Sequence, residues 1–114
     1  MKSFKEFLKN ENIEELENEI NRLKSYLNEN QIKTSSLQEK LEPLIAEENN
    51  LFSAFRKNAT INNQKSWLAC ASKKAGIEQE LMILQGDFLT YNYQIQELEK
   101  RVKSLKQASQ PTNE

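Results

Sequence analysis

The chain has 114 residues, of which 29% are charged and 37% hydrophobic, with only 2 glycines and 2 prolines. A chain with few helix-breaking residues and many charged ones is typical of long helices. The net charge of −1 gives no indication that nucleic acid is a partner. One cysteine and no histidine exclude a histidine–cysteine metal site within the chain. We therefore expect neither a metal nor a cofactor.

Residues 1–10 form an amphipathic segment, in which Phe4, Phe7 and Leu8 lie outside the phase of the heptads that follow. The segment is short and barely basic, so membrane contact is not favoured. It lacks the apolar run of a signal peptide, and no stretch approaches the roughly 20 apolar residues of a membrane span. A cytoplasmic protein is the expectation.

A first helix is predicted over about 11–56, because apolar residues recur at alternating steps of three and four. We call these a and d heptad positions the seam. On this helix the seam comprises Ile13, Leu16, Ile20, Leu23, Leu27, Asn30, Thr34, Leu37, Leu41, Leu44, Glu48, Leu51 and Phe55. Pro43 makes a kink possible. Ser36 and Glu39 fit a capping box, so the alternative is a three-helix arrangement with a break near Thr34–Ser36.

A turn is predicted over about 57–63, the poorest helix-forming stretch of the interior, with Thr60, Asn62 or Asn63 as candidate caps. The second helix, over about 64–107, continues the seam. Its members are Trp67, Cys70, Lys74, Ile77, Leu81, Leu84, Phe88, Tyr91, Ile95, Leu98, Val102 and Leu105. Cys70 is expected to be a small buried residue. Residues 108–114 are interpreted as a disordered tail of a single helical domain, 1–114.

The two seams match if the chain folds back on itself with the turn centred at Ala59. In this register Leu16 meets Val102 and Leu51 meets Trp67. The charges at the facing g positions then pair with opposite signs, which supports an antiparallel coiled-coil hairpin, while the other flank has one like pair, Glu17 with Glu99. These pairs are Glu19–Arg101, Lys33–Asp87, Lys40–Glu80 and Glu47–Lys73, with Glu48 and Lys74 nearly opposite within the seam. Swapped hairpins from two chains would satisfy the same pattern.

A second apolar set lies outside the seam, where we expect another helix to dock. It comprises Leu68, Ala75, Met82 and Leu89 at heptad spacing, with Ala71 and Ile83 nearby and Ile45 and Phe52 on the first helix. The favoured covering is a second hairpin, giving a homodimer. A different protein partner is the next alternative, and the chain's own residues 1–10 are the least expected.

The hairpin tip combines aromatic and basic residues, namely Phe55, Arg56, Lys57, Lys65 and Trp67. Closing the end of the core is the favoured interpretation. Such residues are also enriched at binding hot spots and stack on single-stranded nucleic acid.

No catalytic residue can be nominated, because the chain has no histidine, no glycine-rich phosphate loop and no enclosed carboxylate pair. We predict a non-catalytic protein–protein interaction protein whose partner the sequence does not name. In architecture it resembles the helical-hairpin chaperones and adaptors of export and assembly systems, which implies an adaptor, scaffold or assembly chaperone. The alternative is a nucleic-acid accessory protein that uses the tip.

Overall fold

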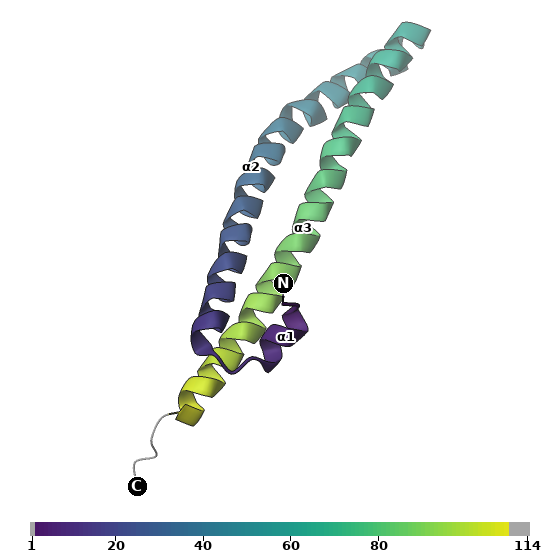
Figure 1. The fold of residues 1–114 in the computed structure, drawn as a ribbon. Helices are drawn as coiled ribbons and strands as arrows, with labels where there is room; N and C mark the ends of the chain where they lie inside the picture. The colour runs from purple at the N-terminus through teal and green to yellow at the C-terminus, as the bar shows by residue number, and fades with distance from the viewer. Residues whose placement is uncertain (1, 110–114) are drawn as a thin grey trace. The chain divides into compact units, whose positions relative to one another are not determined.

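The computed structural model describes residues 2–109, which form three helices and no strand. These are α1 (Phe4–Lys9), α2 (Ile13–Lys57) and α3 (Ile61–Ser109). The two long helices pack against each other as a helical hairpin within one chain (Figure 1). The predicted all-α hairpin is confirmed. Within the same residues, no helix combines the length and the apolarity needed to cross a bilayer.

Side-chain caps define α1 and the beginning of α2. The Ser3 hydroxyl accepts a hydrogen bond from the Glu6 amide at 3.3 Å. The Asn12 side-chain oxygen accepts one from the Glu15 amide at 3.1 Å, immediately before α2 begins at Ile13. Both caps satisfy amide groups that a helix cannot pair internally. They fix the residues at which α1 and α2 begin.

α2 is continuous through both positions where a break was considered. It includes residues 34–36 and Pro43 without interruption, so the three-helix alternative with a break near Thr34–Ser36 is wrong. Pro43 occupies the outward c position between Leu41 and Leu44, which both remain half-buried. The seam contacts on either side of the proline hold the two helical segments in one phase, and these contacts outweigh the local breaking signals.

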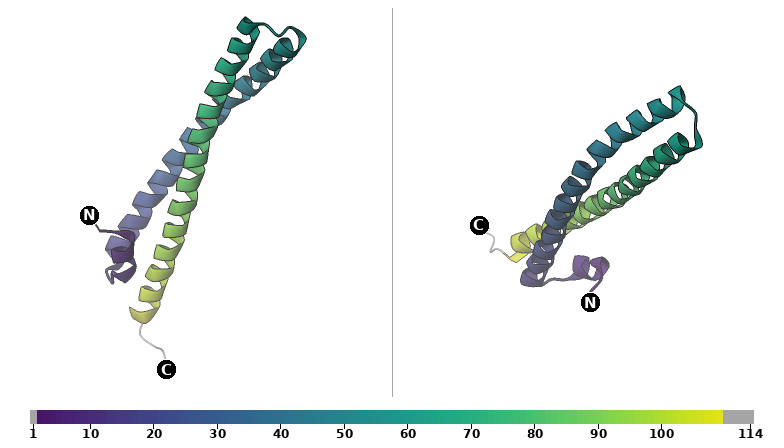
Figure 2. Two further views of the ribbon diagram at one scale, coloured as in Figure 1. Left: turned by 90° about the vertical axis from the view of Figure 1, so that its right-hand side faces the viewer. Right: turned by 90° about the horizontal axis from the view of Figure 1, so that it is seen from above.

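The loop between the long helices consists of residues 58–60 and centres on Ala59, as the register predicts (Figure 2). It is shorter than the predicted 57–63 because Thr60 caps α3. Its hydroxyl accepts from the Asn63 amide at 3.1 Å, and the Asn63 side chain donates to the Asn58 carbonyl at 2.8 Å. At the other end α3 continues to Ser109, and residues 110–114 of the predicted tail lie outside the described residues.

The described chain divides into two compact units, to which both long helices contribute. Unit 1 comprises residues 2–30 and 87–109, and unit 2 comprises residues 31–86. The core of unit 1 is a cluster of buried residues, with Leu16 at 0% and Leu98 at 1% exposure. Its members are Leu16, Ile20, Leu23, Ile95, Leu98 and Val102. Phe4, Phe7 and Leu8 of α1 pack against this cluster.

Unit 2 consists of α2 and α3 alone. All its seam positions, from Thr34 to Phe55 and from Trp67 to Leu84, are half-buried except Cys70, which is buried. The heptad prediction of the contact face is therefore confirmed in unit 2. Two helices without a third element leave the sides of such a seam open to solvent.

Candidate partner-binding surfaces

The polar pair predicted within the seam is formed in unit 2. Lys74 Nζ lies 2.5 Å from a Glu48 carboxylate oxygen, and both side chains are mostly shielded from solvent. The hydrogen bond from Glu48 raises the pKa of Lys74 above its ordinary value. The pair joins α2 to α3, so it serves the hairpin itself and is not available to a partner.

Cys70 is buried in the same seam, as expected. Its thiol donates a hydrogen bond to the Leu44 carbonyl, with sulfur and oxygen 3.6 Å apart. Burial is the main cause that raises the pKa of the thiol, and the carboxylates of Glu47 and Glu48 add to it. A shielded thiol with a raised pKa is a poor nucleophile, so the sulfur acts as a packing group.

The charge pairs predicted beside the seam are not formed as expected. In unit 1, Glu19 binds Arg22 of its own helix, while Arg101 donates to the Asn10 carbonyl at 3.2 Å. The reason is that α1 and its connection to α2 lie beside these residues, where Glu19 is buried. Ion pairs join the two long helices elsewhere in unit 1, at Lys24–Glu99 (3.5 Å) and Glu17–Lys106 (3.2 Å).

The charge pairs predicted beside the seam of unit 2 are not formed either. Among the described residues, neither Lys40–Glu80 nor Glu47–Lys73 closes to an ion pair, and all four side chains are exposed. Solvation of exposed charges competes with pairing and leaves such contacts weak. The fourth expected pair, Lys33–Asp87, has one partner in each unit.

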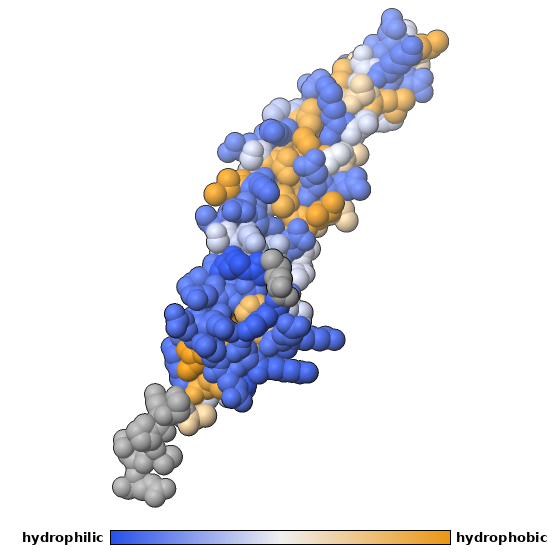
Figure 3. Space-filling view, viewed as in Figure 1, coloured by the Kyte–Doolittle hydropathy of each residue, from blue (hydrophilic) through white to orange (hydrophobic). Residues whose placement is uncertain are grey.

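The predicted docking residues are largely exposed in unit 2. Ile45, Phe52, Leu68 and Met82 are exposed, with Met82 at 72%, and Ala75 is exposed while Ala71 is half-buried. Hydrophobic groups accordingly appear on the surface of unit 2 among polar ones (Figure 3). Leu89, predicted to continue the set, is exposed but belongs to unit 1. We call Leu68, Ala75 and Met82, with Ala71 beside them, the stripe.

Ile61 extends the stripe by one heptad, and the sequence prediction missed it. It is the first residue of α3, seven positions before Leu68, and its side chain is 70% exposed. The heptad spacing was visible in the sequence. The prediction of a turn through residue 63 removed Ile61 from the helix and so from the pattern.

Ile83 does not belong to the stripe. Adjacent residues point about 100° apart around a helix, and Ile83 lines a groove of about 500 Å³ that does not include Met82. We call this surface the groove. It is lined by Ile32, Lys33, Ser36, Leu37, Glu80, Ile83 and Leu84. Ile32 was missed by the sequence prediction because it occupies an f position, which a two-helix heptad leaves to solvent.

The aromatic residues of the tip pack on one another. The rings of Phe55 and Trp67 are stacked, with centroids 5.8 Å apart, and Phe52 contacts Trp67 at 4.9 Å. The Arg56 guanidinium lies 5.9 Å from the centre of the Phe52 ring. This arrangement favours closure of the core end, while the cationic side chains of Lys57 and Lys65 remain exposed.

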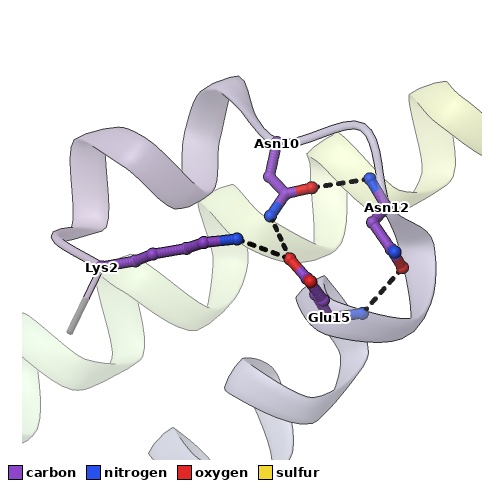
Figure 4. A network of polar contacts seen from close by, with 4 residues as sticks. All are labelled: Lys2, Asn10, Asn12 and Glu15. Carbon is purple, nitrogen blue, oxygen red and sulfur yellow. Dashed lines mark hydrogen bonds and ion pairs between the residues drawn. The ribbon is translucent and has the colours of Figure 1, made fainter.

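A polar network fixes the connection between α1 and α2 (Figure 4). One Glu15 carboxylate oxygen accepts hydrogen bonds from Lys2 at 2.7 Å and from the Asn10 side chain at 2.6 Å. Asn10 in turn accepts from the Asn12 amide at 2.7 Å. The hydrogen bond from Lys2 is the main cause that lowers the pKa of Glu15. The network holds α1 against the rest of unit 1 and is structural in character.

Within residues 2–109 no group of three or more carboxylate or thiol side chains is arranged to hold a metal ion. The chain matches no protein-family model, no curated protein and no solved structure in the comparisons made.

Proposed function

We propose that the protein is a non-catalytic interaction protein, an adaptor, scaffold or assembly chaperone, that docks another helical surface on unit 2. The observation that carries the proposal is the exposure of large apolar side chains at heptad spacing on α3, namely Ile61, Leu68 and Met82. Contiguous exposed apolar surface is uncommon on soluble monomers and marks interaction sites. Burying it removes apolar area from water, which favours association.

A second copy of the chain is the first assembly that we propose for the stripe. Ala75 lies between Leu68 and Met82, so a small residue separates two large ones. A twofold axis near Ala75 would place Leu68 of each copy against Met82 of the other, which gives a self-complementary interface. The small residue at the centre would allow the two helices to approach closely.

The test is the oligomeric state, measured by sedimentation equilibrium across micromolar concentrations. We expect a dimer whose dissociation constant rises at least about tenfold in Met82→Glu, because the new carboxylate would be buried without a partner. Gln79→Glu is the matched control, since it adds the same charge at an outward f position and should leave the dimer unchanged.

A monomer at all these concentrations would overturn the homodimer. The broader interaction proposal then depends on affinity capture from the source cells, using the wild type and Met82→Glu in parallel. A protein retained by the wild type and by Gln79→Glu but lost with Met82→Glu supports it. If capture is the same for all three, the stripe is not a docking surface.

A nucleic-acid accessory protein is the second candidate, favoured by the exposed Lys57 and Lys65 and by Arg56 on the Phe52 ring. Because Phe55 and Trp67 stack on each other, their faces are less available to bases than separate rings would be. Nucleic-acid binding should weaken steeply with salt and with Arg56→Glu. A fluorescence-polarisation titration that shows no binding of single-stranded DNA or RNA at low salt excludes this candidate.

A further inference from the structure

We call the surface of unit 1 that α1 covers the seat of α1, and its residues can be identified by their heptad positions. A pocket between α1 and α2 is lined by Lys2, by Phe7 of α1 and by Glu15, Asn18, Glu19 and Arg22 of α2. The last three of these occupy the f, g and c positions. From α3, Arg101 at a g position donates to the Asn10 carbonyl, and the Tyr93 ring meets Phe4 edge to face at 6.1 Å. α1 therefore covers the g flank of unit 1.

The groove of unit 2 occupies the same heptad positions. A shift of two heptads along each helix converts residues on the g flank of unit 1 into the residues of the groove. On α2 the correspondence is Asn18 to Ile32, Glu19 to Lys33, Arg22 to Ser36 and Leu23 to Leu37. On α3 it is Gln94 to Glu80, Glu97 to Ile83 and Leu98 to Leu84. Every residue that lines the groove has a counterpart in this set.

The g flank of unit 1 and the groove of unit 2 differ in how deeply their residues are buried and in how polar they are. In unit 1, Glu19, Leu23 and Leu98 are buried. In unit 2 their counterparts are less covered, since Lys33 is exposed and Leu37 and Leu84 are half-buried. Ile32 and Ile83 are also exposed, at 63% and 59%. The groove has isoleucine at the two positions where the g flank of unit 1 has Asn18 and Glu97, so the groove is the more apolar of the two surfaces.

We infer that the groove binds a short amphipathic helix of a partner protein, built like α1. This inference deepens the proposed function, on which it rests, by naming the class of partner. α1 fills its seat with apolar residues at the i, i+3 and i+4 positions, namely Phe4, Phe7 and Leu8. A helix with this spacing presents one apolar ridge to a groove between two helices, a common mode of peptide recognition.

The charges beside the groove define the orientation of that helix. Lys33 on α2 and Glu80 on α3 are exposed and line opposite walls. The partner helix should carry an acidic residue on the side of α2 and a basic residue on the side of α3. Charge pairs of this kind select orientation more than they add affinity.

The probe is a synthetic peptide with the sequence of residues 1–12 of this chain, acetylated and amidated so that its ends carry no charge. It is titrated into the ¹⁵N-labelled full-length protein, whose own α1 occupies the seat in unit 1. We expect saturable shifts of amide resonances concentrated at Ile32, Ser36 and Ile83. Affinity should be weak, because a short peptide must also become ordered on binding.

Ile83→Glu should weaken binding of the peptide at least about tenfold, because it places a carboxylate on the apolar wall. Ser72→Glu is the matched control, since Ser72 is also exposed on α3 in unit 2 but lines neither the groove nor the stripe. Both positions are exposed, so both variants should fold, which circular dichroism checks. A peptide with alanine in place of Phe4 and Phe7 should not bind.

Three results would overturn the inference. One is the absence of shifts up to about 1 mM peptide, which corresponds to negligible affinity. Another is a set of shifts confined to unit 1, which would mean exchange with the chain's own α1. The third is equal weakening by Ile83→Glu and Ser72→Glu. None of them changes the expected dependence of dimerisation on Met82, so the proposed function is tested separately.

Discussion

The two units contain the same pair of helices with the same heptad pattern, yet only unit 1 has an enclosed core. Leu16 and Leu44 both occupy d positions of α2, but Leu16 is fully buried and Leu44 is only half-buried. The difference is α1, a helix of 6 residues that adds Phe4, Phe7 and Leu8 to unit 1. A heptad seam therefore determines which residues face each other, while a third element determines how far they are removed from water.

The largest expected effect is the contrast between those two leucines. Leu16→Ala should lower the free energy of unfolding by about 3–4 kcal/mol, and Leu44→Ala by about 1–2 kcal/mol, since the loss scales with burial and with the cavity left behind. Urea unfolding followed by circular dichroism measures both. Equal losses at low protein concentration would break the comparison, because unit 2 would then enclose its seam as fully as unit 1.

Phe7→Ala tests whether α1 is responsible for the contrast. Removing a partly buried ring should cost about 1–2 kcal/mol. It should also increase amide hydrogen exchange in unit 1, at residues 16–27, and leave residues 37–55 unchanged. Lys5→Ala, on the exposed side of α1, is the control. Faster exchange in unit 2 as well would show that α1 acts beyond its own unit.

The Glu48–Lys74 ion pair allows the comparison of the two units to be tested within the seam of unit 2. Lys74→Met alone should destabilise the chain, because it leaves Glu48 unpaired in the seam, whereas Glu48→Leu with Lys74→Met should recover most of the loss. Since the folded state raises the pKa of Lys74, its contribution is complete at neutral pH. It disappears only as pH rises through that raised value. Chemical unfolding between pH 7 and pH 11 measures this, and a double variant less stable than either single one would contradict it.

The smallest expected effect concerns Glu15. Its pKa is lowered in the folded state, so its contribution to α1 docking is present above the usual carboxylate range and is lost as pH falls through the lowered value. Glu15→Gln should reduce this pH dependence, while Glu14→Gln should not. The Tyr93 ring resonances, which sense Phe4, provide the measurement. A pH dependence unaltered by Glu15→Gln would mean that other groups hold α1.

Much of the fold could be predicted from the sequence, because a heptad repeat is a direct record of which side of a helix is in contact. The seam, the loop at Ala59 and the Glu48–Lys74 pair all follow from spacing alone. The seat of α1 could not be predicted in this way. Six residues give too little periodicity to define a docking direction, although the spacing of Phe4, Phe7 and Leu8 did indicate an amphipathic segment.

The surfaces were predicted only in part, for two physical reasons. The flanking ion pairs were inferred as if the hairpin were isolated, but the chain between α1 and α2 occupies the space beside Arg101. Ile83 was predicted to lie near the apolar set of Leu68, Ala75, Met82 and Leu89, but one residue turns a helix by about 100°, and Ile83 lines the groove instead. Three-dimensional positions of exposed residues were needed to separate the stripe from the groove.

The loop of residues 58–60 has a consequence for the order of assembly. It brings Phe55 and Trp67 into contact after a short stretch of chain, whereas the cluster of unit 1 joins Leu16 to Val102 across nearly the whole sequence. Closing a longer stretch of chain costs more entropy and slows folding. We therefore expect the helices to associate first beside the loop, so that the most deeply buried part of the protein is the last to form.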